Sequence, residues 1–299
     1  MPSRNLLSSV VVPTDFSEGA QHALDRALRL PLGPKSKLTL LHVLPDDIPG
    51  KLRKEAIAEA ERSLEKTAAR ASQEILRAGM KVQVVSDVVE GVASEQILKR
   101  AHTVEADVIC MGRHGRRSLT QVLLGSVSSK VVRVSDLPVL VVKSHGLQPG
   151  GAASKAGLNP YRRVVAAIDL LKGSDRVLKA MKPYVEGVVD LSVLHASTIP
   201  YEDFVLLDSS RVEELRVEAL NQATKDLRSL VTKAGLVRAE PKVAAGDARL
   251  LILEEAKAHT AELIVVGTRG VKGLKRVVVG SVAEWVLANA SCDVLVARA

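Results

Sequence analysis

The sequence predicts a doubly wound α/β fold that occurs twice in tandem. One supporting observation is a repeat: Gly112-Arg-His-Gly115 and Gly267-Thr-Arg-Gly270 lie 155 positions apart. Each is followed, after nine further residues, by a Gly-Ser pair, Gly125-Ser126 and Gly280-Ser281. Other landmarks keep the same order with offsets of 153 to 155, so the two halves are expected to share one fold.

The second observation is the alternation of strand and helix patterns within each half. Short runs rich in Val, Leu and Ile are typical of buried parallel strands, and in the first half they cover residues 8–13, 37–43, 81–86, 106–111 and 139–143. Residues 51–78 carry apolar side chains at helical spacing, and Gly79 follows as a C-terminal cap, as Gly235 does in the second half. Five strands and four helices in alternation predict a five-stranded parallel sheet in each half.

The domain boundaries follow from the repeat. We expect one nucleotide-binding domain over residues 1–144 and another over residues 161–299. Residues 145–160 are rich in Gly, Ser and Ala, which is typical of a flexible linker.

Composition excludes several function classes. The net charge is +8, but only 2% of residues are aromatic and no basic stripe alternates with stacking side chains, so nucleic-acid binding is not expected. No apolar run reaches the roughly 18–20 residues of a membrane span, and the N-terminus lacks a signal-peptide layout, which favours a cytoplasmic protein. Cys110 and Cys292 are expected to be buried structural thiols, and Trp285 a core residue.

The glycine pattern predicts a phosphate site. In open parallel sheets, ligands bind beyond the carboxyl ends of the strands where the winding reverses. Gly112 ends the fourth strand and Asp15 follows the first, so both should border one crevice. Gly125-Ser126 should open the next helix, whose free N–H groups favour an anion. The same loops supply positive charge from Arg113, His114, Arg116 and Arg117, and from Arg269, Lys272, Lys275 and Arg276.

Each of these residues also has a plainer interpretation. Asp15 and Asp169 follow strands and could serve as helix caps rather than ligand acceptors. His114 is either a solvated loop residue or a ligand contact. His42 and His195 end strands and are expected to be structural groups with satisfied hydrogen bonds.

With the upstream aspartate and the five-strand layout, the G-x-x-G-x9-G-S pattern resembles the ATP-binding branch of the universal stress protein family over nearly the whole chain. The resemblance implies an adenine nucleotide α-hydrolase-like, Rossmann-like fold. It also implies that the halves pair through their last strands as a pseudo-dimer within one chain, and it leaves open a homodimer of whole chains.

The resemblance also implies which residues contact a nucleotide. Asp15 would meet adenine or ribose, with Pro13 and Val43 lining the base pocket. The ribose and phosphates would be bordered by Met111, Gly112, His114 and Gly115, and the phosphate chain held by Gly125, Ser126, Val127 and Ser128. The matching second-half positions are Ala167, Asp169, Ala196, Val266, Gly267, Arg269, Gly270, Gly280, Ser281 and Val282. Because Arg269 replaces the histidine and Ala167 the proline, the second site is expected to differ in affinity or nucleotide preference.

The function implied is a stress-response module that binds ATP, ADP or AMP, with Mg²⁺ or Mn²⁺ as a candidate counter-ion, and signals its occupancy to an unknown regulatory protein. Two alternatives stay open: a slow ATPase using the same sites, and a nucleotide-free interaction scaffold. Fast hydrolysis is not expected, because the chain lacks a Walker motif and His114 is the one base near the predicted phosphates.

Overall fold

The computed structural model of the chain describes residues 5–115, 124–143, 160–170, 173–197, 209–236, 238–268 and 279–298. The first half forms β1 (Leu7–Pro13), α1 (Glu18–Ala27), β2 (Leu32–Leu44), α2 (Gly50–Arg77), β3 (Gln83–Glu90), α3 (Ala93–Thr103), β4 (Val108–Gly112), α4 (Ser126–Val134) and β5 (Val139–Val142). The second half forms β6 (Arg163–Ala167), α5 (Ser174–Val185), β7 (Asp190–Ser197), α6 (Ser209–Lys233), β8 (Ala239–Ala245), α7 (Ala248–Ala258), β9 (Leu263–Thr268), α8 (Ser281–Asn289) and β10 (Asp293–Arg298). Residues 145–159 of the predicted linker lie outside the described residues.

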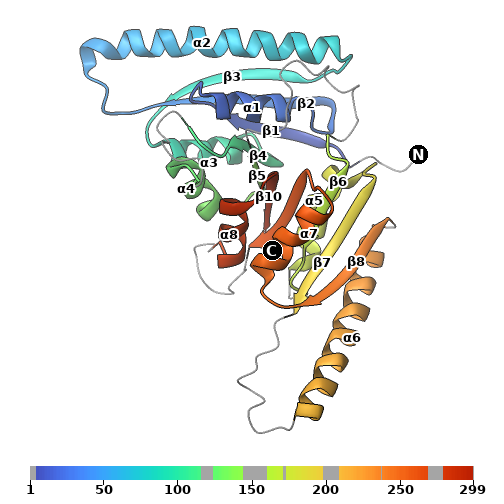
Figure 1. The fold of residues 1–299 in the computed structure, drawn as a ribbon. Helices are drawn as coiled ribbons and strands as arrows, with labels where there is room; N and C mark the ends of the chain where they lie inside the picture. The colour runs from blue at the N-terminus through green and yellow to red at the C-terminus, as the bar shows by residue number, and fades with distance from the viewer. Residues whose placement is uncertain are drawn as a thin grey trace.

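The described strands form one ten-stranded sheet in the order β3-β2-β1-β4-β5-β10-β9-β6-β7-β8. Within each half all pairings are parallel. The exception joins the halves: β5 and β10 pair antiparallel, with Leu140 opposite Leu295. The last strands therefore pair as the resemblance implies, and the long helices α2 and α6 lie at opposite ends of the sheet (Figure 1).

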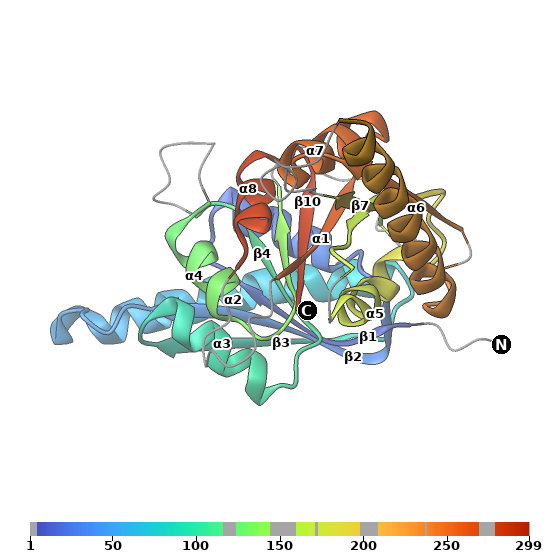
Figure 2. The same ribbon diagram turned by 90° about the horizontal axis from the view of Figure 1, so that it is seen from below.

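Alternate side chains along each strand point to opposite faces of the sheet, and both faces are covered by helices. Val10 and Val12 belong to a buried cluster that includes side chains of α1, α2, α5 and α6, whereas Val11 belongs to one that includes side chains of α3, α4, α7 and α8. On the second face α4 and α8 lie side by side (Figures 1 and 2), and Arg133 of α4 forms an ion pair with Glu284 of α8 at 2.9 Å. Helices on both faces of the sheet are the predicted doubly wound arrangement.

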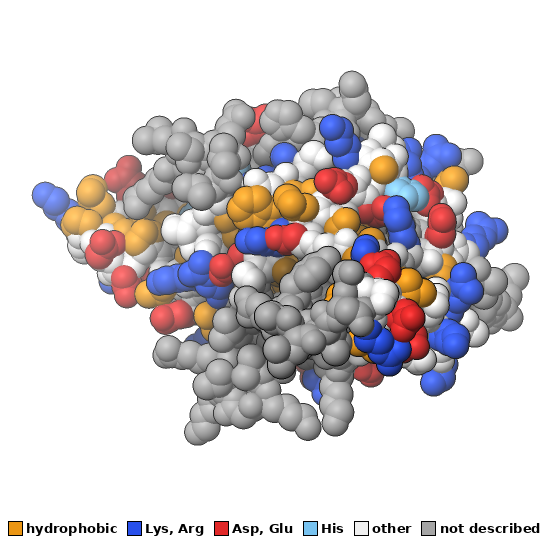
Figure 3. Space-filling view, turned by 60° about the horizontal axis from the view of Figure 1, so that its bottom comes forward, with side chains coloured by type: hydrophobic (Ala, Val, Ile, Leu, Met, Phe, Trp, Pro, Cys, Tyr) orange, Lys and Arg blue, Asp and Glu red, His pale blue; other side chains and the backbone are white. Residues whose placement is uncertain are grey.

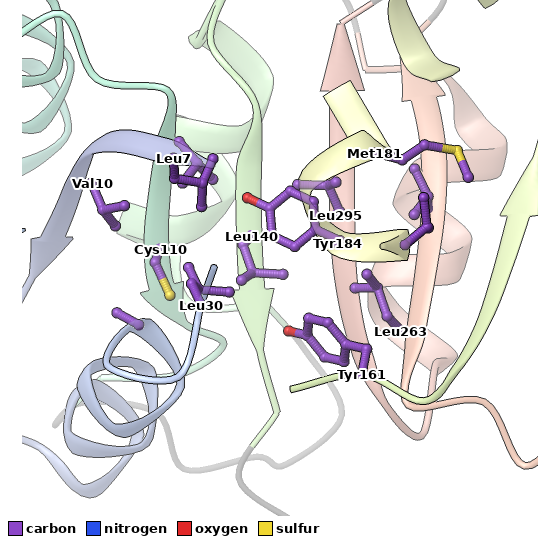
Figure 4. Close-up of a cluster of buried hydrophobic side chains, with 14 of the residues drawn as sticks. Leu7, Val10, Leu30, Cys110, Leu140, Tyr161, Met181, Tyr184, Leu263 and Leu295 are labelled. Atoms are coloured by element: carbon purple, nitrogen blue, oxygen red, sulfur yellow. The ribbon is translucent and has the colours of Figure 1, made fainter. Parts of the chain in front are cut away.

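The two halves share one core. Figure 4 shows Leu30 and Leu140 of the first half beside Tyr161, Tyr184 and Leu295 of the second. All five side chains are at most 1% exposed. Their burial removes a continuous apolar surface from water across the β5–β10 junction, and the halves are therefore stabilised together.

A buried ion pair also joins the halves. Arg26 of α1 lies 2.7 Å from the Asp293 carboxylate of β10, and the Tyr161 hydroxyl donates a hydrogen bond to the same oxygen at 2.9 Å. The Lys143 backbone N–H donates to the other oxygen. Burial raises the pKa of Asp293, and Arg26 opposes that shift.

The predicted strands and helix ends agree closely with the observed elements. The largest boundary difference is β2, which begins at Leu32 because Leu7 pairs with Leu32 before the register shifts at Ser9. Gly79 and Gly235 follow α2 and α6 with φ of +70° and +73°, the left-handed conformation that makes glycine a helix stop. Both predicted caps are confirmed.

Two predictions about single side chains need correction. Trp285 is not a core residue: 41% of it is exposed, because the buried stripe of α8 is formed by Ala283, Val286 and Leu287 and Trp285 lies beside that stripe. Cys110 is fully buried as expected, but Cys292 is only partly buried. Burial still raises the pKa of the Cys292 thiol to about 12, so it remains protonated at neutral pH.

The surface carries mixed charge. Figure 3 shows acidic and basic side chains interspersed on one face of the molecule, with apolar side chains between them. Among the described helices, none is both long enough and apolar enough to cross a membrane.

Candidate functional site

The first and fourth strands of each half are neighbours. β1 pairs with β4 through Val10 and Val108, and β6 pairs with β9 through Ala167 and Val266. The winding therefore reverses between these strands, as predicted, and the crevice beyond their carboxyl ends is the expected ligand position.

In the second half this crevice is a cavity of about 810 Å³. It lies among the ends of β6, β7 and β9 and the first turns of α5, α7 and α8. Ligand sites in proteins commonly measure about 300–1,000 Å³. Eight of the ten predicted second-half residues line it: Ala167, Asp169, Ala196, Val266, Gly267, Gly280, Ser281 and Val282. Arg269 and Gly270, like Lys272, Lys275 and Arg276, lie outside the described residues.

Sequence reasoning missed one wall of the cavity, formed by the first turn of α7. Asp247, the N-cap of α7, accepts a hydrogen bond from the Arg249 N–H at 2.8 Å, and its carboxylate pairs with the Arg249 guanidinium. That guanidinium lies 5.5 Å from the centre of the Trp285 ring. The repeat held a signal for this wall, because the landmark Ala245-Gly246 directly precedes it.

The helix-cap interpretation of the two aspartates is wrong. Ser17 is the N-cap of α1 and Gly173 is the N-cap of α5. Asp15 instead accepts a hydrogen bond from the Ser17 N–H at 3.0 Å, and Asp169 accepts one from the Ser174 hydroxyl at 3.0 Å.

The turn after each aspartate has the same unfavourable backbone. Phe16 and Leu170 have φ of +61° and +57°, although neither is glycine. Such conformations persist only where the surroundings hold them, and they are frequent at functional sites. His42 and His195 hold the turns, since their Nδ1 atoms lie 2.7 and 2.8 Å from the carbonyl oxygens of Thr14 and Ile168. The structural role predicted for both histidines is confirmed, and His195 also lines the cavity.

The predicted phosphate-binding helices begin where the sequence indicated. Gly125 is the N-cap of α4 and Gly280 that of α8, and a glycine N-cap has no side chain to bond the first-turn N–H groups. These groups have no partner within the helix, so a helix start of this kind can hydrogen-bond an anion. Ser126 and Ser281 are exposed on the first turns, whereas the buried Ser128 hydroxyl donates to the Gly112 carbonyl and holds α4 against β4.

The predicted first-half residues lie at the equivalent strand ends. Pro13 and Met111 are buried at the ends of β1 and β4, and Val43 and Val127 are half-buried at its sides. Gly115 lies against Asp15: a Cβ atom on Gly115 would overlap the Asp15 Oδ2 atom. The carboxylate and the glycine segment are therefore brought together, as the sequence predicted.

The Arg113 side chain reaches into the second half of the molecule. Its side chain is 5% exposed and donates hydrogen bonds to the carbonyl oxygens of Ala288 and Ala290 at the end of α8. Lys143 donates to Ala290 as well, at 2.7 Å. Burial lowers the pKa of the Arg113 guanidinium. Arg113 joins the two halves, because its guanidinium lies at the partially negative C-terminal end of α8. Arg116 and Arg117 lie outside the described residues.

The family model described as "Universal stress protein family" matches residues 7–143 and again residues 160–298. The chain belongs to the universal stress protein family. The two matches cover both halves of the chain, which is therefore a tandem of two such domains.

Among curated universal stress proteins, MJ0577 of Methanocaldococcus jannaschii is 29% identical over 161 residues, covering 46% of this chain and 96% of its own. Universal stress protein Mb2028c of Mycobacterium bovis is 28% identical over 243 residues, 79% of this chain and 76% of its own. A solved universal stress protein from Archaeoglobus fulgidus superposes with a TM-score of 0.67 at 24% identity, over 97% of this chain and 98% of that one, which shows the fold.

Proposed function

We propose that this universal stress protein binds ATP or a related adenine nucleotide in the crevice of each half and acts as a regulatory module. The observation that carries the proposal is the second-half cavity of about 810 Å³, with a carboxylate, Asp169, on one side and the exposed start of α8 on another.

The chemistry of the lining suits such a ligand. Ala196, Val266 and Val282 offer an apolar surface to a purine ring. A carboxylate accepts hydrogen bonds from ribose hydroxyls or an exocyclic amine, and the N–H groups at Gly280-Ser281 favour phosphate oxygens. Regulation then follows by mass action: a ligand that binds only the folded chain stabilises it by about 2.7 kcal/mol at 100 times its Kd.

The test is an ATP titration by calorimetry of the full chain, preceded by anion-exchange analysis of nucleotide released on denaturation. We expect bound adenine nucleotide and saturable ATP binding. In the double variant Asp15→Ala/Asp169→Ala the affinity should fall by at least about tenfold, because each substitution removes a charged acceptor.

The matched control is Asp136→Ala/Asp226→Ala, which removes the same charge from two exposed acids outside the crevices. It should leave ATP affinity unchanged. If wild type neither releases nor binds adenine nucleotide, the proposal is wrong and the interaction-scaffold alternative replaces it.

A further inference from the structure

An arginine lies in the wall of the second-half cavity. Arg249 belongs to the first turn of α7 and lines the cavity together with Asp247, the N-cap of that helix. Among the lining residues that the structure describes, Arg249 is the only one with a lysine or arginine side chain. A negatively charged ligand in this cavity therefore has a cation within reach.

Two neighbours hold the Arg249 guanidinium in place. Its Nε–H donates to both carboxylate oxygens of Asp247, with N–O distances of 3.0 and 3.1 Å. The guanidinium carbon lies 5.5 Å from the centre of the Trp285 ring, within range for a cation–π interaction. A guanidinium that is held at its edge by a carboxylate and at its face by a ring is preorganised, so it loses less side-chain entropy when it binds a ligand.

The Trp285 ring also shows where Arg249 lies along the cavity wall. Trp285 follows Ser281 by about one turn of α8, so the two residues share one face of that helix. A helical side chain leans towards the N-terminus of its helix and covers the preceding turn. Helices α7 and α8 pack side by side (Figures 1 and 2). Arg249 therefore lies on the side of the cavity where the start of α8 would bind phosphate oxygens.

The ion pair with Asp247 leaves the guanidinium available to a ligand. The side chains of Arg249 and Asp247 are 46% and 36% exposed, and ion pairs of such exposure contribute little to stability. A phosphate carries more charge than a carboxylate and accepts two parallel hydrogen bonds from a guanidinium. A phosphate group can therefore compete with Asp247 for Arg249.

The first half does not repeat this cluster. The residues 155 positions before Asp247, Arg249 and Trp285 are, in order, Val92, Ser94 and Lys130. Ser94 is buried, and the apolar Val92 side chain has no group that could hold a guanidinium. A contact between Arg249 and a ligand is therefore a feature of the second half.

We propose that Arg249 binds the phosphate chain of the nucleotide in the second-half cavity and so sets how strongly this site prefers a nucleotide to its nucleoside. This inference rests on the proposed function. When the ligand binds, the guanidinium exchanges Asp247 oxygens for phosphate oxygens, while Trp285 continues to support its face. In the absence of ligand, Asp247 keeps the arginine beside the cavity.

The first test compares ATP, AMP and adenosine by calorimetric titration of the full chain. It uses the Asp15→Ala background, in which the first-half site should be weakened and the second-half site dominates. Arg249→Gln should weaken ATP binding about 10- to 100-fold, because a charged donor to the phosphates is lost. The affinity for adenosine should stay unchanged, because adenosine has no phosphate.

The matched control is Arg216→Gln. Arg216 lies on α6, away from the residues that line the cavity, and it pairs with Glu213 at a similar side-chain exposure of 41%. This variant should leave every affinity unchanged. Unchanged ATP affinity in Arg249→Gln, or equal losses for ATP and adenosine, would overturn the inference. No binding of any of these ligands to wild type would instead overturn the proposed function.

A second variant separates phosphate binding from a structural role of the ion pair. Asparagine caps a helix about as well as aspartate, so Asp247→Asn keeps the cap of α7 while it removes the competing charge. ATP affinity in the same background should then rise about 2- to 5-fold. If Arg249 only stiffened the start of α7 through Asp247, this variant would weaken ATP binding as Arg249→Gln does. Unchanged or weaker binding would therefore contradict the proposed exchange.

Discussion

The third strand of each half is joined to the following helix by an ion pair, and the two pairs have opposite polarity. Asp87 of β3 pairs with Arg100 of α3 at 2.8 Å, whereas Lys242 of β8 pairs with Glu255 of α7 at 2.5 Å. Lys242 and Glu255 each lie 155 positions after their first-half counterparts, Asp87 and Arg100. Both halves thus keep an ion pair between the third strand and the following helix, but the acidic and the basic residue have exchanged places.

The second-half pair has further partners. Glu255 is 5% exposed and accepts a hydrogen bond from Ser192 at 2.7 Å, and it lies 3.1 Å from His259, which in turn contacts Asp190 at 2.7 Å. Hydrogen bonds from Lys242 and Ser192 lower the pKa of Glu255, although burial opposes the shift. Helix α7, which is anchored in this way, also forms a wall of the second-half cavity. The halves therefore differ in how firmly that wall is held.

The largest expected loss of stability follows from breaking the buried ion pair at the junction between the halves. Arg26 has Ala180 as its counterpart and Asp293 has Pro138, so their buried ion pair exists on one side of the junction only. Arg26→Ala should lower the free energy of unfolding by about 3–5 kcal/mol, because it leaves the buried Asp293 carboxylate without its cation. Urea denaturation measures this. Adding Asp293→Asn should recover part of the loss, and no recovery would argue against an uncompensated charge as the cause.

The reversed ion pairs give the next largest effect. Glu255→Ala should cost about 2–3 kcal/mol of unfolding free energy, because the buried carboxylate has several partners that lose their hydrogen bonds. Arg100→Ala changes the counterpart of Glu255, whose side chain is 29% exposed against 5% for Glu255, and should cost about 0–1 kcal/mol. Equal losses in urea denaturation would show that the additional partners in the second half contribute nothing.

A smaller effect concerns pH. The hydrogen bond with Asp190 raises the pKa of His259 above its ordinary value, although burial opposes this. A raised folded-state pKa means that the stabilisation is complete below the unfolded pKa of about 6.5 and is lost as pH rises through the folded value. The stability difference between wild type and His259→Gln should therefore be largest near about pH 6 and shrink towards pH 8.

Thermal unfolding across this pH range checks the prediction. His102→Gln is the control, because His102 forms its ion pair with Asp136 at the exposed surface and should contribute little. A difference between wild type and His259→Gln that stays constant with pH would exclude protonation of His259 as the source.

The smallest effect is expected where the halves meet at the surface. Arg133 and Glu284 pair across α4 and α8, with 60% and 45% of their side chains exposed. Arg133→Ala should change the unfolding free energy by at most about 0.5 kcal/mol, since exposed pairs gain little. A loss above about 1 kcal/mol in urea denaturation would mean that this pair, and not only the buried junction, joins the halves.

The features predicted correctly from the sequence alone are those determined by local chemistry and by repetition. Apolar strands, the glycines that end α2 and α6, and the Gly-Ser starts of α4 and α8 depend on backbone preferences over a few residues. The repeat then predicted that both halves share one topology, and hence that Asp15 and Gly115 would meet.

Only the tertiary structure decided where individual side chains go. Arg113 directly follows β4, the strand whose end was predicted to border the phosphate site. Its guanidinium nevertheless donates a hydrogen bond to Ala288 of α8, a residue 175 positions away in the sequence. Arg249 lines the second-half cavity although the glycine pattern does not predict its position. The direction of a long side chain depends on the hydrogen-bond partners and the burial that the folded chain offers. Both are provided by residues that are distant in the sequence.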